Sequence, residues 1–559
     1  MKANNYKKNS DLVYSGIERT AHRALIMAAG LKQNQIKRPL IAIANSWNEI
    51  NPGHVHLRRL AKFIKQGVIG AGGTPLEFNT IAVCDGIAML HDGMRYSLPS
   101  RDIIAASVEI MVKAHGFDAM VMVASCDKAI PGMLMAAMRL NIPAILVNGG
   151  PMRGGIFGKR KNLCSGDAYE MAGRYFNRNI TKRDLKAFER SVCPGPGSCS
   201  HMATANTMAL AAEAMGMILA GGSTPLAVSK KRVKYAYESG KRIMYLLRKN
   251  ITPDKIVSKE SIENSIRVVL ATGGSTNAIL HLIAIAKEND ISIDLESFDR
   301  LSRNTPYLCS LKPSGIYTLY DLDRAGGVQA VLKALGPLIN KEVITVNGVS
   351  IDSQIRKAKI MNRRVIRSID NPITADGGIV VLKGNIAKWG AIVKKSAVNE
   401  CMLTFAAKAK VFESEEDAIK YLYTLKSPKK EVLVIRNEGP KGGPGMREML
   451  GATATLCARG FDQHMAVITD GRFSGASKGL AIGHVCPEAA DRGAIGIIKD
   501  GDVIKIDIRK RSIHLEANAA TIRERLKTFK PKVRQRKGFL SVYKRNVQNV
   551  SEGAILGSI

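Results

Sequence analysis

Several features that are common in chains of 559 residues are missing from this sequence. Its nine cysteines form no C-x-x-C pair, which argues against a zinc ribbon or a thioredoxin-like motif. The N-terminal stretch has no apolar segment typical of a signal peptide. The longest apolar run, residues 208–222, contains Glu213 and is too short to span a bilayer. These absences predict a soluble, cytoplasmic protein with reduced cysteines and no membrane partner.

Aromatic residues are also scarce, at 5%, whereas the formal net charge is +35. A strongly basic chain can indicate nucleic-acid binding. Here the basic residues are spread along the sequence, no nucleic-acid-binding motif is seen, and few aromatic rings are available for base stacking. We therefore predict no nucleic-acid partner. A basic nucleic-acid-binding protein is kept as the alternative from another functional class; steeply salt-dependent binding without enzymatic activity would support it.

The order of apolar runs and helical patterns predicts an α/β protein with two domains. Residues 38–150 alternate continuous apolar strands with helices, the pattern of a doubly wound, mostly parallel sheet. Residues 160–370 are mainly helical in pattern. From about residue 372, short β-type runs with Gly and Asp turns predict a β-rich, barrel-like domain. We place the α/β domain at 1–370 and the barrel-like domain, with a basic helical tail, at 371–559.

Two predicted strands end in the same pair of residues. "AVCDG" contains Cys84 and Asp85, and "VASCDK" contains Cys126 and Asp127. If the strands are neighbours, two thiols and two carboxylates gather at one edge of the sheet. Thiolates suit iron-sulfur clusters and carboxylates suit magnesium. One such pair alone is better explained by a buried thiol and a helix cap, but two pairs favour a metal site.

A third candidate thiol lies in "CPGPGSCSHMATANTMA". Cys199 precedes an Ala/Met-rich helix, whose N-terminus should lower the pKa of the thiol. Cys193, in the same loop, is a weaker candidate because nothing fixes its direction. The other five cysteines are predicted to be structural: Cys164, Cys309, Cys401, Cys457 and Cys486. The histidines show no metal-ligand spacing, and we interpret them as polar residues with satisfied hydrogen bonds, His201 included.

Two Gly-rich stretches mark the C-terminal domain. "NEGPKGGPGMREML" lacks the GK[ST] ending of a phosphate-binding loop, and Glu448 is its candidate functional residue. "ITDGRFSGASKG" follows a predicted strand and presents Ser474, but it is not a G-x-S-x-G motif. A serine in such a turn is usually only a turn residue. As a catalytic base, Ser474 would need a cation nearby.

Six blocks together resemble the dihydroxy-acid dehydratase family, which also contains sugar-acid dehydratases. They are "FNTIAVCDGIAM", "MRYSLPSRDIIAASVE", "SCDKAIPGMLMA", "GSCSHMATANTM", "EGPKGGPGMREM" and "ITDGRFSGASKGLAIGHVCPEAA". The resemblance implies an N-terminal α/β domain, a C-terminal barrel-like domain, an iron-sulfur cluster, a magnesium ion and a homodimer. It also implies dehydration of 2,3-dihydroxy-3-methylbutanoate and 2,3-dihydroxy-3-methylpentanoate to the 2-oxo acids that precede valine and isoleucine. A sugar-acid dehydratase is the alternative enzyme.

The resemblance also assigns roles motif by motif. It implies cluster ligands at Cys126 and Cys199, and a proposed base at Ser474. It implies magnesium ligands at Asp85, Asp127 and Glu448, with a further ligand from Lys128 if that lysine is N6-carbamylated.

One position departs from the family pattern. Members with a 2Fe-2S cluster carry a cysteine in the loop that here contains Gly53. Either Cys84 supplies the third ligand or the cluster differs in type, so 2Fe-2S and 4Fe-4S both stay open. Cys193 is the main competitor of Cys84.

Overall fold

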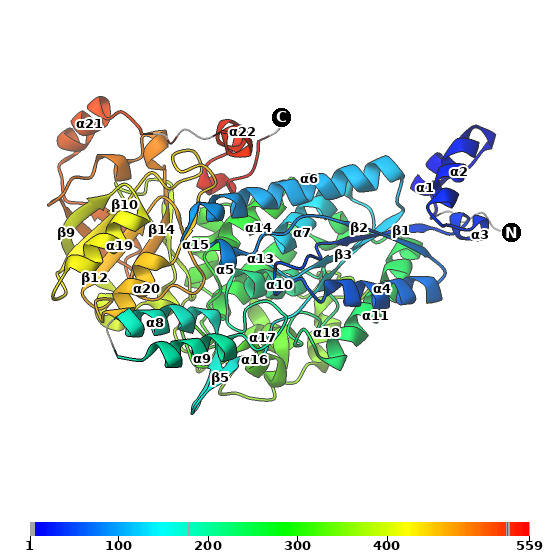
Figure 1. Ribbon diagram of the computed structural model, residues 1–559, viewed down its shortest axis with the longest axis horizontal. Coiled ribbons are helices and arrows are strands. Elements are labelled where there is room, and N and C mark those ends of the chain that lie inside the picture. Colours follow the sequence, from blue (N-terminus) through cyan, green and yellow to red (C-terminus); the bar gives the residue numbers. More distant parts are fainter. Residues whose placement is uncertain (1–5, 177–178, 533, 535–536, 558–559) are drawn as a thin grey trace.

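A four-stranded parallel sheet organises the N-terminal half of the molecule (Figure 1). The computed structural model describes residues 6–176, 179–532, 534 and 537–557. The strand order is β2-β1-β3-β4, with every pairing parallel. The strands are β1 (Leu40–Asn45), β2 (Thr74–Asn79), β3 (Ala119–Ala124) and β4 (Ala144–Asn148). Strands β1, β3 and β4 are buried throughout, which explains their continuous apolar runs.

Helices cover both faces of this sheet (Figure 1). On one face α4 (Leu57–Gly70) packs against α11 (Lys230–Lys249). On the other, α6 (Ser97–His115) packs against α7 (Ala129–Leu140). This arrangement follows from right-handed crossovers in a sheet whose order reverses at β1. The predicted doubly wound sheet is therefore confirmed.

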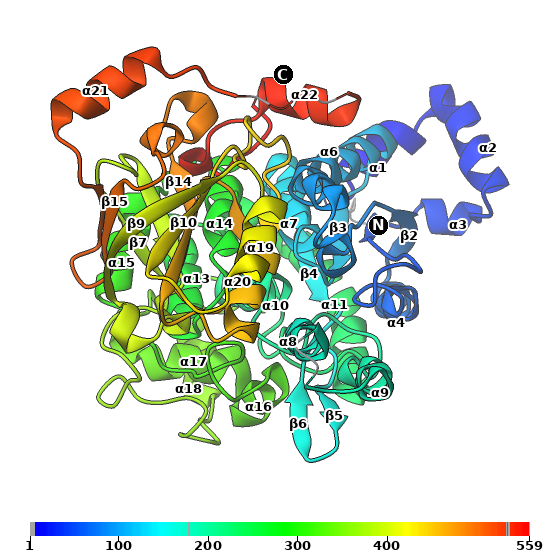
Figure 2. The ribbon, with the colours of Figure 1, turned by 60° about the vertical axis from the view of Figure 1, so that its left-hand side comes forward.

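A helical layer connects the two halves (Figure 2). Helix α10 (Thr204–Ala214) contacts α7, α13 (Lys259–Ala271) and α14 (Asn277–Lys287). Helix α13 also packs on α15 (Leu295–Arg303), which in turn contacts strand β7 of the C-terminal sheet. Helices α10 and α14 are buried along their whole length apart from Lys287, so they form the centre of the molecule.

The C-terminal half contains an eight-stranded mixed sheet in the order β16-β15-β9-β10-β12-β14-β8-β7. A bridge between Lys383, just after β7, and Ser512, at the start of β16, joins the two edge strands. The sheet is thus nearly closed, as the predicted barrel-like domain requires. Its strands are β7 (Val380–Leu382), β8 (Gly390–Val393), β9 (Thr404–Phe412), β10 (Glu431–Ile435), β12 (Met465–Thr469), β14 (Ala481–Cys486), β15 (Val503–Asp507) and β16 (Ser512–Leu515).

The remaining elements are short strands and peripheral helices. The short strands are β5 (Gly155–Phe157), β6 (Arg160–Leu163), β11 (Glu448–Met449) and β13 (Arg472–Phe473). The helices are α1 (Asn9–Tyr14), α2 (Thr20–Ala28), α3 (Gln33–Ile36), α5 (Asp85–Ala88), α8 (Ser165–Phe176), α9 (Lys182–Val192), α12 (Pro253–Ile256), α16 (Leu319–Ala325), α17 (Gly327–Leu335), α18 (Ile351–Lys357), α19 (Glu415–Thr424), α20 (Gly451–Ala458), α21 (Ala519–Thr528) and α22 (Phe539–Asn546).

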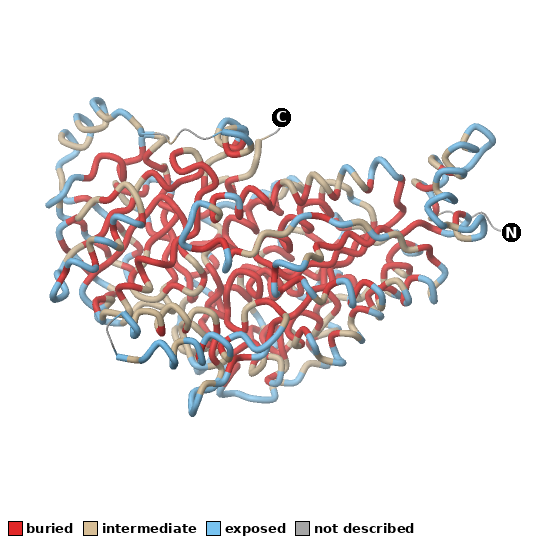
Figure 3. Tube along the Cα trace, viewed as in Figure 1, coloured by how far each residue is buried: buried red, intermediate tan, exposed pale blue. Residues whose placement is uncertain are grey.

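The first and last described segments of the chain lie at the surface (Figure 1). The N-terminal arm, residues 9–28, projects away from the body and is mostly exposed (Figures 1 and 3). The predicted basic tail does pack back as a helix, because Leu540 and Tyr543 of α22 are buried. Residues 533, 535, 536, 558 and 559 of that tail lie outside the described residues. None of the described helices combines the length and apolar character needed to cross a membrane.

The predicted geometry of the two Cys-Asp pairs was wrong in two respects: the first pair does not lie at a strand end, and the two strands are not neighbours. Strand β2 ends at Asn79, five residues before Cys84, and β1 lies between β2 and β3. The strand stops because its partner β1 also stops, at Asn45, which pairs with Asn79. The following apolar residues therefore have no strand to pair with and lead toward α5 instead.

Candidate functional site

The predicted functional residues meet in one cavity of about 220 Å³ between the two halves of the chain. The N-terminal half contributes the two Cys-Asp pairs and the Cys199 loop. The C-terminal half contributes Glu448, Leu450, Ser474 and Ala476. Neither half alone therefore forms the site. The structure brings together every predicted thiol, carboxylate and hydroxyl at this cavity, although Cys84 reaches it from the start of α5 and not from a strand end.

Three buried carboxylates provide the oxygen ligands of the site. One ligand atom from each of Asp85, Asp127 and Glu448 lies within 4.8 Å of the others. Burial, together with the neighbouring Asp85, raises the pKa of Asp127 to about 7. Such crowding of carboxylates is unfavourable unless a cation neutralises them.

Lys128 lies among these carboxylates. Its Nζ is 2.5 Å from Asp85 Oδ2 and 3.8 Å from Glu448 Oε2, and the side chain is almost fully buried. Without modification, the ammonium group of Lys128 therefore places one positive charge beside the three carboxylates. The donors are all oxygens, which fits a magnesium ion. Carbamylation would convert Lys128 from a positive group into a further oxygen donor.

Side chains that the sequence analysis missed hold the carboxylates in place. Ser97 Oγ donates to Asp85 Oδ1 at 2.7 Å. Asn277 Nδ2 and Arg472 donate to Glu448 Oε2 at 2.9 and 3.0 Å. No motif marks Asn277, which lies about 170 residues before Glu448, and only the tertiary structure brings the two together.

A two-stranded ribbon places Glu448 beside Ser474. Strands β11 and β13 are parallel, and Glu448 pairs with Arg472 in register. Ser474 directly follows β13, and its backbone N–H donates to the carbonyl of Met449 at 2.9 Å. The ribbon therefore fixes the hydroxyl next to a carboxylate of the oxygen cluster. Burial raises the pKa of Glu448, although the positive charges of Lys128 and Arg472 act in the opposite direction.

Four thiols line the cavity: Cys84, Cys126, Cys193 and Cys199. They offer the soft donors that an iron-sulfur cluster requires. Asn51 Nδ2 lies 3.1 Å from Cys126 Sγ. A Cβ on Gly53 would lie 3.4 Å from the same sulfur, so the loop position where some family members carry a cysteine faces this part of the site.

The expected helix effect on Cys199 was wrong. Helix α10 begins only at Thr204, and burial raises the pKa of Cys199 well above its usual range, as it does for Cys126. Nearby Asp127 acts in the same direction. In the absence of a metal both thiols are therefore protonated, and a bound metal would have to displace the protons.

Cys193 and the remaining cysteines differ in their setting. Cys193 ends α9 and is exposed, yet it borders the same cavity. The five cysteines predicted to be structural do not line the cavity in the described structure, and Cys401 among them is exposed.

His201 does not have the satisfied hydrogen bonds that we expected. It is 1% exposed and lines the cavity, and neither ring nitrogen has a hydrogen-bond partner within the described part of the chain. Burial, reinforced by the charge of Lys394, lowers the pKa of His201 to about 4. The ring is therefore neutral and has one donor and one acceptor available to a molecule in the cavity.

The first Gly-rich stretch has a structural explanation. The carboxylate of Glu488 accepts hydrogen bonds from the backbone N–H groups of Lys441 and Gly442 at 2.9 and 2.8 Å. A Cβ on Gly439 would lie 2.4 Å from this carboxylate. A side chain of the protein itself thus occupies the place that a phosphate would take in a nucleotide-binding loop, in agreement with the missing GK[ST] ending.

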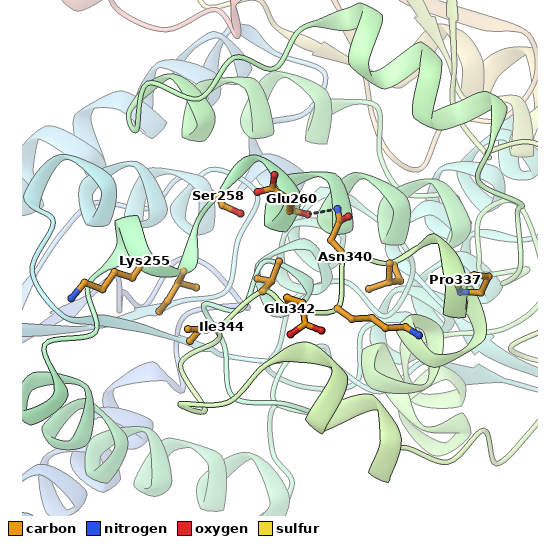
Figure 4. Close-up of a pocket in the computed structure, with 11 residues that line it drawn as sticks. Lys255, Ser258, Glu260, Pro337, Asn340, Glu342 and Ile344 are labelled. Carbon is orange, nitrogen blue, oxygen red and sulfur yellow. Dashed lines mark hydrogen bonds between the residues drawn. The ribbon is translucent and has the colours of Figure 1, made fainter.

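A larger hollow of about 680 Å³ lies elsewhere, beside the start of α13 and the loop at residues 337–344 (Figure 4). Its polar groups serve the local structure. Ser258 caps α13, and Asn340 donates to the backbone carbonyl of Glu260 at 3.2 Å. No catalytic set of side chains gathers there among the described residues, so the cavity between the two halves is the candidate active site.

Comparisons with known proteins agree with this site. The family model for the N-terminal domain of dihydroxy-acid/6-phosphogluconate dehydratases matches residues 38–354, and the model for the C-terminal domain matches residues 364–554. The chain therefore belongs to the dihydroxy-acid/6-phosphogluconate dehydratase family. It is a dehydratase, an enzyme of the hydro-lyase class.

Similar proteins within this family are named dihydroxy-acid dehydratases. The chain is 50% identical over 552 residues to a dihydroxy-acid dehydratase of Ignicoccus hospitalis, covering 98% of this chain and 100% of the relative. It is 50% identical over 550 residues to one of Caldanaerobacter subterraneus, covering 98% and 99%. It is 46% identical over 552 residues to one of Methanosarcina barkeri, covering 98% and 100%. The predicted resemblance is thus confirmed over nearly the whole chain.

Proposed function

We propose that this enzyme removes water from 2,3-dihydroxy-3-methylbutanoate and 2,3-dihydroxy-3-methylpentanoate, yielding the 2-oxo acids that precede valine and isoleucine. The observation that carries the proposal is one cavity that combines an oxygen cluster, thiols and Ser474 with an apolar wall. Ile87, Met89 and Leu450 line that wall. Apolar side chains favour the methyl and ethyl groups of a branched substrate over the hydroxyls of a sugar acid.

Two inorganic groups belong to the proposal. We assign magnesium to the oxygen cluster, and an iron-sulfur cluster of either type to three of the thiols. The proposed magnesium ligands are Asp85, Asp127, Glu448 and carbamylated Lys128, and the proposed cluster ligands are Cys126, Cys199 and Cys84. When bound, the two groups would supply positive charge at the substrate carboxylate and C2 hydroxyl and a Lewis acid at the C3 hydroxyl.

The protein's own residues perform the proton chemistry. Ser474 Oγ acts as a general base in its alkoxide form, which positive charge nearby would stabilise, and it takes the proton from C2. Asn277 and Arg472 hold Glu448, so that the neighbouring hydroxyl and carboxylate keep fixed relative positions. The C3 hydroxyl leaves as hydroxide and gives an enol. The proton held by Ser474 then passes to this hydroxide, which releases water and restores the alkoxide, and the enol tautomerises to the 2-oxo acid. The reaction involves no net oxidation and therefore needs no nicotinamide cofactor.

A direct assay tests the proposed substrates. The enzyme is purified without oxygen, its iron, sulfide and magnesium are measured, and 2-oxo acid formation is followed with 2,3-dihydroxy-3-methylbutanoate, arabinonate and 6-phosphogluconate. We expect rapid product formation from the branched acid and at least tenfold lower kcat/KM with the two sugar acids. The reverse order would assign the chain to the sugar-acid branch of its family.

We further propose a homodimer in the cytoplasm. The exposed apolar residues of the N-terminal arm support self-association: Leu12 is 73%, Ile17 90% and Leu25 72% exposed. Apolar side chains that project together from the body usually mark an interface.

A further inference from the structure

Lys394 is a buried lysine that pairs with no carboxylate among the residues that the structure describes. It directly follows β8 and is 7% exposed. Its Nζ donates to the backbone carbonyl of Gly475 at 3.2 Å, and no ion pair involves it in the described part of the chain. An unpaired buried ammonium costs free energy of folding. A residue that served only for packing would be apolar at this place.

The accepting carbonyl belongs to the loop that carries the proposed base. Gly475 follows Ser474 and packs closely, because a Cβ there would lie 3.1 Å from both Ala203 Cα and the Ser275 side chain. Lys394 and Ser474 also line one small cavity of about 10 Å³, near the lower limit for one water molecule. The Ser474 loop is thus held by these packing contacts, by the backbone hydrogen bond from Ser474 to Met449, and by the hydrogen bond from Lys394 to Gly475.

We propose that Lys394 is a positioning residue for the reaction: its hydrogen bond to Gly475 fixes the loop and so places Ser474 Oγ against the C2 proton of the substrate. This inference rests on the proposed function, in which Ser474 is the base. A displacement of about 1 Å in a reacting group can cost on the order of 100-fold in rate. One hydrogen bond that fixes the loop can therefore matter greatly for turnover.

Lys394→Met tests the proposal because it keeps most of the length of the side chain and removes the donor. With the metals loaded, we expect kcat to fall about 10- to 100-fold while KM changes less than about twofold. Iron, sulfide and magnesium contents should stay at the wild-type level. The melting temperature should be unchanged or higher, because an unpaired buried charge is lost. A purely structural lysine would instead lower the melting temperature together with activity.

Lys395→Met is the matched control. Lys395 is the next residue, but its side chain forms an ion pair with Asp376, and within the described residues it has no hydrogen bond or ion pair with the Ser474 loop. We expect wild-type kinetics from this variant. In addition, Lys394→Ala should regain part of its kcat when ethylammonium is added, because the small cation can enter the vacated space and donate to the carbonyl.

A measurement without turnover separates this inference from the proposed function. Backbone amide hydrogen exchange of residues 472–479 should be faster in Lys394→Met than in the wild type and in Lys395→Met. If the wild type failed to dehydrate the branched acids, this exchange result would still decide whether Lys394 fixes the loop. Unchanged exchange, or a wild-type kcat in Lys394→Met with an active wild type, would overturn the inference.

Discussion

At the scale of single residues, Ser474 is the side chain on which the proposed chemistry depends most. It lies beside Glu448 but is assigned to proton transfer and not to metal binding. We expect Ser474→Ala to lower kcat by about 100- to 10,000-fold, the usual contribution of a general base. Iron, sulfide and magnesium contents should remain at the wild-type level. Near-normal turnover would remove Ser474 from the mechanism and point to a metal-bound hydroxide as the base.

Cys84 and Cys193 are the two candidates for the third ligand of the proposed cluster. Cys84 opens helix α5 and lines the cavity, whereas Cys193 is exposed at the end of α9. We expect Cys84→Ala, prepared without oxygen, to lose cluster iron and sulfide and all activity while its far-UV circular dichroism is retained. Cys193→Ala should keep the cluster. The opposite pattern would assign the ligand to Cys193.

Lys394 also leaves a signature in the pH dependence of stability. Burial lowers its pKa from 10.5 to about 7. Between these values the unfolded chain binds more protons than the folded one, so the free energy of unfolding rises with pH through this window. The free-energy cost of burying protonated Lys394 is fully present below pH 7 and disappears near pH 10.5. Urea unfolding from pH 6.5 to 9.5 should therefore show a steeper rise for the wild type than for Lys394→Met. Parallel curves would mean that Lys394 has an ordinary pKa.

At the scale of elements, the β11–β13 ribbon and helix α14 together fix Glu448. Asn277, at the start of α14, donates to this carboxylate and accepts from Arg472. We expect Asn277→Ala to weaken magnesium binding about 10- to 100-fold, the usual effect of losing a group that orients a metal ligand. The dependence of activity on magnesium concentration measures this effect.

Asn264→Ala provides the control for that experiment. Asn264 is likewise a buried asparagine, but it bonds to the backbone of Asn340 away from the carboxylates. It should lower the melting temperature without changing the magnesium dependence. If activity depended on magnesium concentration in the same way in Asn277→Ala and Asn264→Ala, Asn277 would contribute only to stability.

The sequence predicted elements well where their pattern is local. Continuous apolar runs and helical periodicity correctly indicated β1, β3 and β4 and the helices between them, because each reflects burial of its own residues. The end of β2 could not be predicted in this way. The apolar residues after Asn79 continue a strand-like pattern, and only the end of the partner strand at Asn45 stops the pairing. Strand length there depends on a residue 34 positions away in the sequence.

At the scale of the whole molecule, the site is shared by two halves that are far apart in the sequence. The motifs predicted which residue types gather, because two Cys-Asp pairs in one domain favour a metal site although a single pair does not. They could not reveal Asn277, Arg472 or Lys394, whose importance comes from tertiary contacts alone. The same is true of His201, whose missing partners are apparent only once its surroundings are known. Nothing in the structure explains the net charge of +35.

The projecting N-terminal arm leads to a prediction about assembly. The arm that carries residues 12, 17 and 25 projects from the body of the molecule (Figures 1 and 3). The apolar side chains of Leu12, Ile17 and Leu25 are largely exposed, which is unfavourable in water unless a partner covers them. A stable homodimer typically buries about 1,600 Å² or more, which an exchanged arm can help to supply. We expect sedimentation to give about twice the chain mass of 60.6 kDa for the wild type.

The double variant Ile17→Asp and Leu25→Asp should sediment as a monomer, because two carboxylates in the interface would have to lose their water. Ile316→Asp is the control: Ile316 is 69% exposed but lies in a loop far along the chain from the arm, and its substitution should leave the dimer intact. If the double variant stayed dimeric, another surface would hold the two copies together. If the control also dissociated, added negative charge and not the arm would be the cause.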